Sequence, residues 1–229
     1  MKTNNVEVVA EIGVNHDGSL KKAKLLALAA RDAGADFVKI QSFSAELLAL
    51  RSTPKVGYQK RRDSSHSHFE MLSRLALSHS DQEKLQAFCL GEGIGFFSTP
   101  YDPSQVSFLA GIGVPYIKIA SADIIDVDLL EAAAATGIPP IVSTGMASIQ
   151  EISSAVNLFE SEGADITLLH AISMYPAPVG SLRLGSILEL KRRFNVRVGF
   201  SDHSEGALAA SVAVALGSAM VEKHLTLDK

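Results

Sequence analysis

One pattern recurs along the chain and constrains its fold more than any other feature: a helical stretch, a glycine, one or two further residues and a short apolar run. Examples are "DAGADFVKIQS" (32–42), "ATGIPPIVSTG" (135–145) and "ALGSAMVEKHL" (215–225). The glycine is typical of the residue that closes a helix in a left-handed conformation. The nearly uninterrupted apolar run is typical of a parallel strand that is buried on both faces. The repeat therefore predicts helices that alternate with parallel strands.

Repeats of this kind place eight strands in the chain, with helices in all seven gaps. The expected strands are 6–12, 37–42, 95–99, 116–120, 140–144, 166–171, 196–200 and 219–225. Eight β/α alternations predict an α/β fold of the (β/α)8 or TIM-barrel type, with a doubly wound open sheet as the alternative. Because the sequence stops just after the last strand, we expect residues 1–229 to be one barrel domain that lacks its eighth helix and is truncated there.

Three short motifs mark expected helix starts. Ser-x-x-Glu capping boxes occur at 80–83 and 148–151. The stretch "DPSQ" at 102–105 places a proline at a first helical position. Each motif lies in a gap between expected strands, which supports the alternation.

The composition excludes several partners and locations. The net charge of −4 and the isoelectric point near 6.0 exclude nucleic acid and an anionic membrane as main partners. The N-terminus lacks an apolar signal segment, and the most apolar long window, 206–217, is about half a membrane span. The single cysteine, Cys89, excludes an internal disulfide and lies on an apolar helix face, where we expect it in the core. We expect a soluble cytoplasmic protein.

Polar residues end all eight expected strands, at the end of a barrel where active sites lie. They are Glu11, Lys39, Gln41, Ser98, Thr99, Lys118, Ser121, Ser143, Thr144, His170, Ser173, Asp202, His203, Glu222 and His224. A single serine there is ordinarily a helix cap and a lysine ordinarily extends to the rim, but eight coincidences on one face indicate a site. Lysines and hydroxyls stabilise phosphate and carboxylate charge, so the set predicts an anionic, phosphorylated substrate. The chain has no Walker or Gly-x-Gly-x-x-Gly motif to indicate a nucleotide site.

Two histidines at neighbouring strand ends suggest a metal site. The ends of strands seven and eight are neighbours in a closed barrel, so His203 and His224 can meet there. Imidazole pairs suit Mn, Fe, Co or Zn, and two protein ligands leave positions open for substrate and water. The alternative is a pair of surface-turn histidines. We expect His66, His68 and His79 to be surface residues.

Motifs along the whole chain, in order, resemble those of the sialic acid synthase family. The motifs are "AEIGVNHDGSLKKAKLLALAARDAGADFVKIQSF", "FFSTPYD", "YIKIASAD", "IVSTGMAS", "LLHAISMYPAP", "GFSDHSEG" and "EKHLTLDK". This family comprises the N-acetylneuraminate, legionaminate and pseudaminate synthases and related spore-coat polysaccharide proteins. The resemblance covers essentially all 229 residues.

The resemblance implies a reaction, a metal and a partner. The reaction is the condensation of phosphoenolpyruvate (PEP) with an N-acylated mannosamine-type sugar, which gives a nine-carbon 2-keto-3-deoxy acid and phosphate for surface-carbohydrate biosynthesis. A divalent metal, Mn²⁺ with Mg²⁺ or Co²⁺ as alternatives, is held by the histidines matching His203 and His224 and polarises the sugar aldehyde. The family's full-length proteins are homodimers with a C-terminal antifreeze-like domain, which we expect to be absent here.

The resemblance also implies roles for individual residues. Those matching Lys39, Thr99, Lys118, Ser121 and Ser143 bind PEP. The residues matching Glu11, Gln41 and Tyr175 contact the sugar or the reacting centre, with Glu11 catalytic. Asp202 is expected to orient His203, as carboxylates behind metal ligands commonly do.

Two departures from the family's pattern affect the expected site. Asp123 stands where the family has a glutamate, so its catalytic carboxyl is one methylene shorter. Ser173 stands where asparagine is common, which alters the expected contacts to the N-acyl group. Two other functions stay open: a Schiff-base aldolase that uses Lys39 or Lys118 as nucleophile, and a truncated barrel that binds PEP and metal without turnover.

Overall fold

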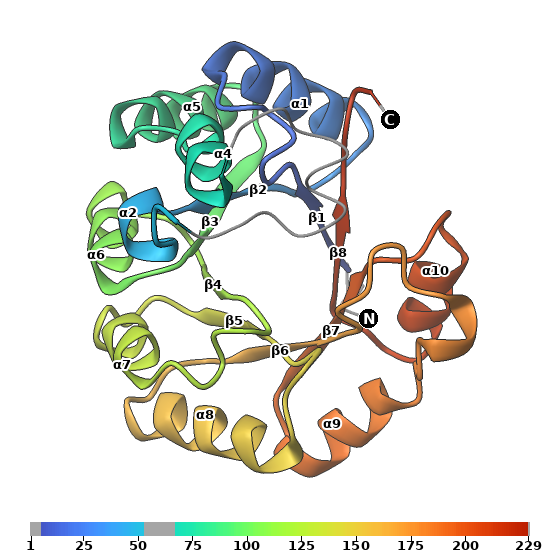
Figure 1. Cartoon of the computed structure of the whole chain (residues 1–229). Coiled ribbons are helices and arrows are strands. Elements are labelled where there is room, and N and C mark those ends of the chain that lie inside the picture. Colours follow the sequence, from blue (N-terminus) through green and yellow to red (C-terminus); the bar gives the residue numbers. More distant parts are fainter. Residues whose placement is uncertain (1–5, 53–66, 229) are drawn as a thin grey trace.

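A computed structural model describes residues 6–52 and 67–228 of the chain, and its strands form a closed parallel barrel (Figure 1). The strands are β1 (Glu7–Glu11), β2 (Phe37–Ser42), β3 (Gly95–Pro100), β4 (Ile117–Ile119), β5 (Pro140–Ser143), β6 (Thr167–Ala171), β7 (Arg197–Asp202) and β8 (Met220–His224). Each strand pairs with its neighbours in sequence order, and β8 pairs with β1. The expected (β/α)8 barrel is therefore confirmed, and the open sheet is wrong because β1 and β8 have no free edge.

Helices cover the outside of the barrel between successive strands (Figure 1). They are α1 (Leu20–Asp32), α2 (Ala45–Leu48), α4 (His68–Leu75), α5 (His79–Gly91), α6 (Pro103–Ile112), α7 (Val127–Ala135), α8 (Ile149–Ser161), α9 (Ser186–Phe194) and α10 (Leu208–Ala215), with a 3-10 turn, η1 (Val179–Ser181). None of the described helices is long and apolar enough to cross a membrane. Within residues 6–52 and 67–228, seven α-helical connections and eight strands match the repeat that the sequence shows.

The glycine that follows a helix has the expected left-handed conformation. Gly34 has φ 82° after α1, and Gly217 has φ 90° after α10. Any other residue would be strained at these angles because its Cβ would crowd the following carbonyl group. These two glycines therefore end their helices and turn the chain into β2 and β8.

Two of the three expected helix starts are confirmed and one is wrong. Ser148 and Glu151 form a reciprocal capping box before α8, and Pro103 begins α6 behind the cap residue Asp102. The helix expected to start from the box at 80–83 begins earlier, because Ser78 is its cap and accepts a hydrogen bond from the Asp81 backbone N–H at 3.2 Å.

The core lies inside the barrel and between the strands and the helices. Its largest fully buried side chains include Phe96, Phe97, Phe159 and Phe200. Cys89 is also fully buried in this core, as expected.

The histidines expected at the surface have different positions. His79 is exposed and stacks on Phe108, with ring centroids 3.8 Å apart. His68 is half-buried at the start of α4, and His66 lies outside the described residues.

Candidate active site

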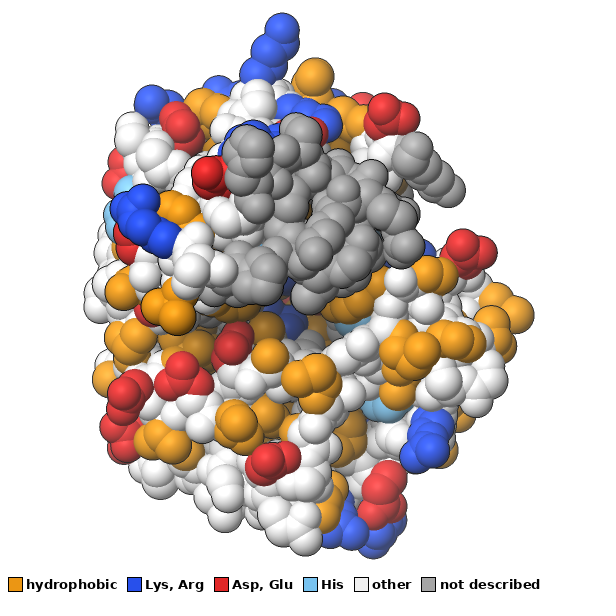
Figure 2. Space-filling model, in the orientation of Figure 1, with side chains coloured by type: hydrophobic (Ala, Val, Ile, Leu, Met, Phe, Trp, Pro, Cys, Tyr) orange, Lys and Arg blue, Asp and Glu red, His pale blue; other side chains and the backbone are white. Residues whose placement is uncertain are grey.

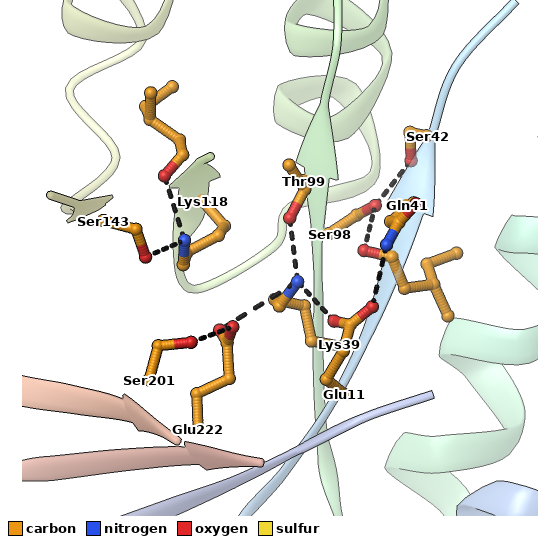
Figure 3. Close-up of polar contacts among 12 residues, drawn as sticks. Glu11, Lys39, Gln41, Ser42, Ser98, Thr99, Lys118, Ser143, Ser201 and Glu222 are labelled. Carbon is orange, nitrogen blue, oxygen red and sulfur yellow. Dashed lines mark hydrogen bonds and ion pairs between the residues drawn. The ribbon is translucent and has the colours of Figure 1, made fainter. Parts of the chain in front are cut away.

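The C-terminal ends of the strands bring polar side chains together inside the barrel (Figure 3). Glu11 is the register partner of both Lys39 on β2 and His224 on β8, and Gln41 is the partner of Thr99 on β3. Residues alternate between the two faces of a strand, so apolar neighbours such as Ile40 point out into the core while these polar side chains point in. Figure 2 shows Lys or Arg atoms inside a hollow near the centre of this face.

Lys39 is the centre of one buried polar cluster. Its ammonium forms an ion pair with Glu11 and donates a hydrogen bond to Thr99 Oγ1 at 2.9 Å. Gln41 donates to the other oxygen of Glu11 at 3.2 Å. Burial by itself would lower the pKa of Lys39, but the Glu11 and Glu222 carboxylates outweigh burial and raise it above its ordinary value. Lys39 is therefore protonated at neutral pH.

Lys118 is equally buried but has neutral partners. Its ammonium donates to Ser143 Oγ at 2.6 Å and to the Ile119 carbonyl at 2.9 Å. Burial lowers the pKa of Lys118 to about 8, and the Lys39 charge adds to this effect while Glu222 opposes it. This lysine therefore titrates close to physiological pH.

A third group of polar atoms surrounds Gly145, directly after β5. The Gly145 N–H donates to Ser121 Oγ at 2.9 Å. A Cβ at this position would lie 2.8 Å from Ser173 Oγ and 3.0 Å from Ser121 Oγ, so only glycine leaves the two hydroxyls in place. The Ser121 and Ser173 hydroxyls therefore lie close together, and hydroxyl groups can donate to an anion.

His203 and His224 meet at the mouth, as expected from the barrel. Their ring centroids are 5.8 Å apart, and the exposed Tyr175 ring packs against both, with its centroid 4.1 Å from that of His203. His203 Nδ1 lies 2.7 Å from the Ile172 carbonyl, which can only accept, so Nδ1 carries the proton and Nε2 keeps its lone pair. Burial lowers the pKa of His203, which favours the neutral ring.

The histidine pair fits a divalent cation with few protein ligands. A neutral imidazole whose Nδ1–H is held by a carbonyl is the usual form of a metal-binding histidine. Among residues 6–52 and 67–228, no three His, Cys, Asp or Glu side chains are grouped to hold a metal ion.

Asp202 does not orient His203, which corrects the sequence-based expectation. β7 continues to Asp202, two residues beyond the expected strand end, and side-chain alternation puts Asp202 on the outer face. Its carboxylate accepts from the Ser204 N–H at 2.8 Å and from Lys223 at 2.8 Å. Asp202 therefore joins β8 to the turn after β7.

Asp123 lies in the turn after β4 and is half-buried. Burial and the nearby Asp126 raise the pKa of Asp123 to about 6, although Lys118 opposes the shift. Its Oδ2 atom is buried and has no hydrogen-bond partner in the described part of the chain. A carboxyl group with these properties can exchange a proton near neutral pH.

Three other strand-end residues are structural rather than part of the site. The Ser98 and Thr144 hydroxyls donate to the Ile40 and Leu169 carbonyls, each at 3.1 Å. His170 Nε2 bonds the Leu182 carbonyl at 2.7 Å.

The sequence-based reasoning listed Glu222 among the strand-end polar residues without a specific role and did not name Ser201; both lie in the site. Ser201 is the register partner of Glu222 and donates to its carboxylate at 3.2 Å. Alternate residues of a strand share one face, and Ser201 and Glu222 lie two residues before His203 and His224. This spacing was the signal in the sequence that could have placed both in the site.

These observations define a class: a (β/α)8 barrel whose mouth holds two buried lysines, hydroxyl groups, acids and a histidine pair, suited to a small anionic ligand. Residues 26–229 match the NeuB family, and the chain belongs to this family.

Named relatives and a solved structure agree with this membership. The N,N'-diacetyllegionaminic acid synthase of Legionella pneumophila is 39% identical over an alignment of 228 residues that covers 97% of this chain. The pseudaminic acid synthase of Helicobacter pylori is 34% identical over 226 residues, covering 97% of this chain and 66% of its own. The N-acetylneuraminic acid synthetase of Leptospira borgpetersenii, solved with citrate, has a TM-score of 0.89 at 34% identity, over 98% of this chain and 75% of that one. The chain spans 64% of the length of the Legionella relative.

Proposed function

We propose that this barrel condenses PEP with an N-acylated, mannosamine-type amino sugar. A bond forms between C3 of PEP and the aldehyde carbon of the open-chain sugar. Water adds at C2 of the PEP unit, and inorganic phosphate leaves. The product is a nine-carbon 2-keto-3-deoxy acid of the kind that the relatives' names describe.

One observation carries the proposal: two buried lysines lie at the mouth beside hydroxyl groups. PEP has a phosphate and a carboxylate, and ammonium and hydroxyl groups stabilise both charges. Lys39 and Thr99 are positioned for one anionic group, and Lys118 and Ser143 for the other. The water-poor setting strengthens each of these interactions.

The two histidines would hold a divalent cation, Mn²⁺ in our proposal. When bound, such an ion supplies a Lewis acid for a substrate carbonyl. The residues of the chain do the rest in this proposal: Ile172 fixes the His203 ring, Tyr175 packs against both imidazoles, Asp123 exchanges a proton, and Glu11 holds the Lys39 ammonium. Binding of Mn²⁺ can be measured by the loss of the paramagnetic resonance signal of the free ion. We expect the His203→Ala variant to show no such binding.

Calorimetric titration of the chain with PEP tests the lysine assignment. We expect Lys118→Met to weaken PEP binding at least tenfold, about 1.4 kcal/mol, because a buried ammonium is lost. Lys84→Met, which removes a largely exposed ammonium on α5, should bind PEP like the unmodified chain. Equal affinities in the two variants, or no binding to the unmodified chain, would contradict the proposal.

Phosphate release separates catalysis from binding. With Mn²⁺, PEP and N-acetylmannosamine present, turnover supports the condensing enzyme. Binding of Mn²⁺ and PEP without any turnover selects a barrel that only binds. We also propose that full-length members with this barrel are cytoplasmic homodimers, which sedimentation of a full-length protein would test.

A Schiff-base aldolase is the second candidate, because burial lowers the pKa of Lys118 to about 8. A lysine of this kind can attack a carbonyl group as the neutral amine. Borohydride trapping of a substrate–lysine adduct, with activity that survives EDTA, would select it. The Lys39 ammonium is the poorer nucleophile because Glu11 keeps it protonated.

A further inference from the structure

A polar link on the outer face of the barrel ties the turn that carries one histidine of the pair to the strand that carries the other. β7 and β8 lie side by side, and their pairing ends with Asp202 opposite Lys223 (Figure 1). Each of these two residues is followed directly by one of the two histidines. Because successive residues of a strand point to opposite faces, Asp202 and Lys223 point away from the site while the imidazoles point into its mouth.

Lys223 holds both neighbours of His203 in the chain. Its ammonium donates to the Asp202 carboxylate at 2.8 Å and to the Ser204 carbonyl at 2.8 Å. The other carboxylate oxygen of Asp202 accepts from the N–H of Ser204 at 2.8 Å and from its hydroxyl at 2.6 Å. We call Asp202, Ser204 and Lys223 the outer link, because their hydrogen bonds join the turn on either side of His203 to β8.

Burial makes the outer link more than a surface ion pair. An exposed pair contributes little, because water competes for both charges and two side chains must be held still. The Asp202 side chain is 0% exposed, whereas that of Lys223 is 34% exposed. Water cannot replace a lost partner at a buried carboxylate, so separation of this pair is strongly unfavourable. The turn after β7 and the end of β8 are therefore held together.

The two imidazoles depend on the outer link to different degrees. The Nδ1–H of His203 also donates to the Ile172 carbonyl at 2.7 Å, which fixes that ring from β6. The exposed His224 ring contacts the Tyr175 and His203 rings, and no hydrogen bond holds it among the residues that the structure describes. The place of His224 relative to His203 therefore depends on how β8 is attached to the turn after β7.

We propose that Lys223 is a positioning residue: from the strand that carries His224 it holds both neighbours of His203, and so fixes the spacing of the two imidazoles for a divalent cation. This inference rests on the proposed function, in which the two histidines hold such an ion. The ring centroids are 5.8 Å apart. A cation binds more tightly to ligands that are already held at a suitable separation, because ordering them on binding costs free energy.

Mn²⁺ binding to a double variant, Asp202→Asn with Lys223→Met, tests the proposal. The two changes remove the ion pair without altering the net charge and without leaving a buried charge unpaired. We expect Mn²⁺ to bind about fivefold more weakly, because groups behind metal ligands commonly change metal affinity by this order or more. The matched control is Lys191→Met, which removes a hydrogen bond of 2.8 Å to the Gly217 carbonyl before the start of β8. The control should bind Mn²⁺ like the unmodified chain, and an unchanged affinity in the double variant would overturn the inference.

Single variants of Lys223 separate position from charge and do not require the double variant to fold. Loss of a positive charge by itself favours a bound cation, whereas loss of the outer link weakens its binding. We therefore expect weaker Mn²⁺ binding in Lys223→Met. Lys223→Arg keeps a cation that can donate to both oxygen atoms, so its loss should be smaller. Unchanged or tighter binding in Lys223→Met would rule the inference out, as would an equal loss in the two variants.

Magnetic resonance of the metal-free chain separates this inference from the proposed function. The Overhauser contact between the His203 and His224 ring protons should be present in the unmodified chain and weaken in the double variant. The contact between His203 and Tyr175, whose ring centroids are 4.1 Å apart, should persist because Ile172 holds the His203 ring in both chains.

The ring contact decides the role of Lys223 even where Mn²⁺ does not bind. If the unmodified chain binds no Mn²⁺, the metal part of the proposed function fails, and the Overhauser measurement still stands. A role in stability alone would lower the unfolding temperature of the double variant and leave its contact between His203 and His224 unchanged. That result would contradict the inference, as would the absence of the contact from the unmodified chain.

Discussion

Lys39 and Lys118 occupy similar buried positions on β2 and β4, yet their pKa values shift in opposite directions. Glu11 forms an ion pair with Lys39 and raises its pKa, whereas burial dominates at Lys118 and lowers its pKa to about 8. The difference comes from one carboxylate at contact distance rather than from burial, which both lysines share. At the scale of the residue, the nearest carboxylate therefore decides the direction in which the pKa of a buried lysine shifts.

His16 allows a test of buried charge outside the site. It is 1% exposed, its Nδ1 accepts from the Gly18 N–H at 3.1 Å, and its Nε2 has no hydrogen-bond partner among the residues that the structure describes. Burial lowers its pKa to about 4, so the folded chain stays unprotonated there while the unfolded chain takes up a proton below about pH 6.5. Stability should fall as the pH falls from 6.5 to 4.

We expect the chain to lose about 2 kcal/mol more unfolding free energy than His16→Gln between pH 7 and pH 4.5, measured by urea unfolding. Glutamine keeps an acceptor for Gly18 but cannot be protonated. Parallel stability curves for His16→Gln and the unmodified chain would contradict the assignment of a buried neutral imidazole.

At the scale of the element, the start of α5 shows how a local motif can be ambiguous. Ser80 and Glu83 fit a capping box, but Ser78 and Asp81 fit the same spacing two residues earlier. Tertiary contacts decide between them: Gln82 is buried, donates to the Leu77 carbonyl and accepts from Ser42 on β2. These bonds fix the first turn against the barrel.

Thermal and urea unfolding of two serine variants can test this helix start. Ser78→Ala removes the side chain that caps the Asp81 N–H and should cost about 1 kcal/mol of unfolding free energy. Ser80→Ala changes an exposed residue inside the first turn and should cost less than about 0.5 kcal/mol. A larger loss of stability in Ser80→Ala than in Ser78→Ala would instead support a helix that starts at the motif at 80–83.

At the scale of the whole molecule, β8 closes the barrel. It pairs with β1 from Glu7 to Glu11 on one side and with β7 on the other. Leu225, just beyond β8, donates to the Glu11 carbonyl and accepts from the Asn15 side chain. Without this strand, β1 and β7 would each have a free edge, which is prone to aggregation.

A chain that ends after Gly217 should lose cooperative thermal unfolding, followed by circular dichroism, and should aggregate. A chain that ends after Leu225 lacks only four residues and should unfold like the unmodified chain, because every pairing of β8 remains. A cooperative transition in the shorter chain would show that the barrel does not depend on closure by β8.

Most of the fold was predictable because its signals are local. Glycines after helices, apolar runs and the box at 148–151 depend on neighbouring residues, and their positions agree with the strands and with α8. The site was predictable to the extent that strand ends carry polar side chains. The direction of the Asp202 side chain could not be predicted, because β7 continues two residues beyond its apolar run. Successive residues of a strand point to opposite faces of the sheet, so the exact end of the strand decides where Asp202 points.

By itself, the sequence determined the alternation of helices and strands and the end of the barrel at which the polar residues gather, because both follow from short-range periodicity. Only the tertiary structure decided which charges meet. Glu11 contacts Lys39, and Glu222 lies 3.9 Å from Lys39, because β8 returns beside β1 to close the sheet. The physical reason is that electrostatic effects depend on distances across the barrel, and distances between remote residues exist only once the sheet has closed.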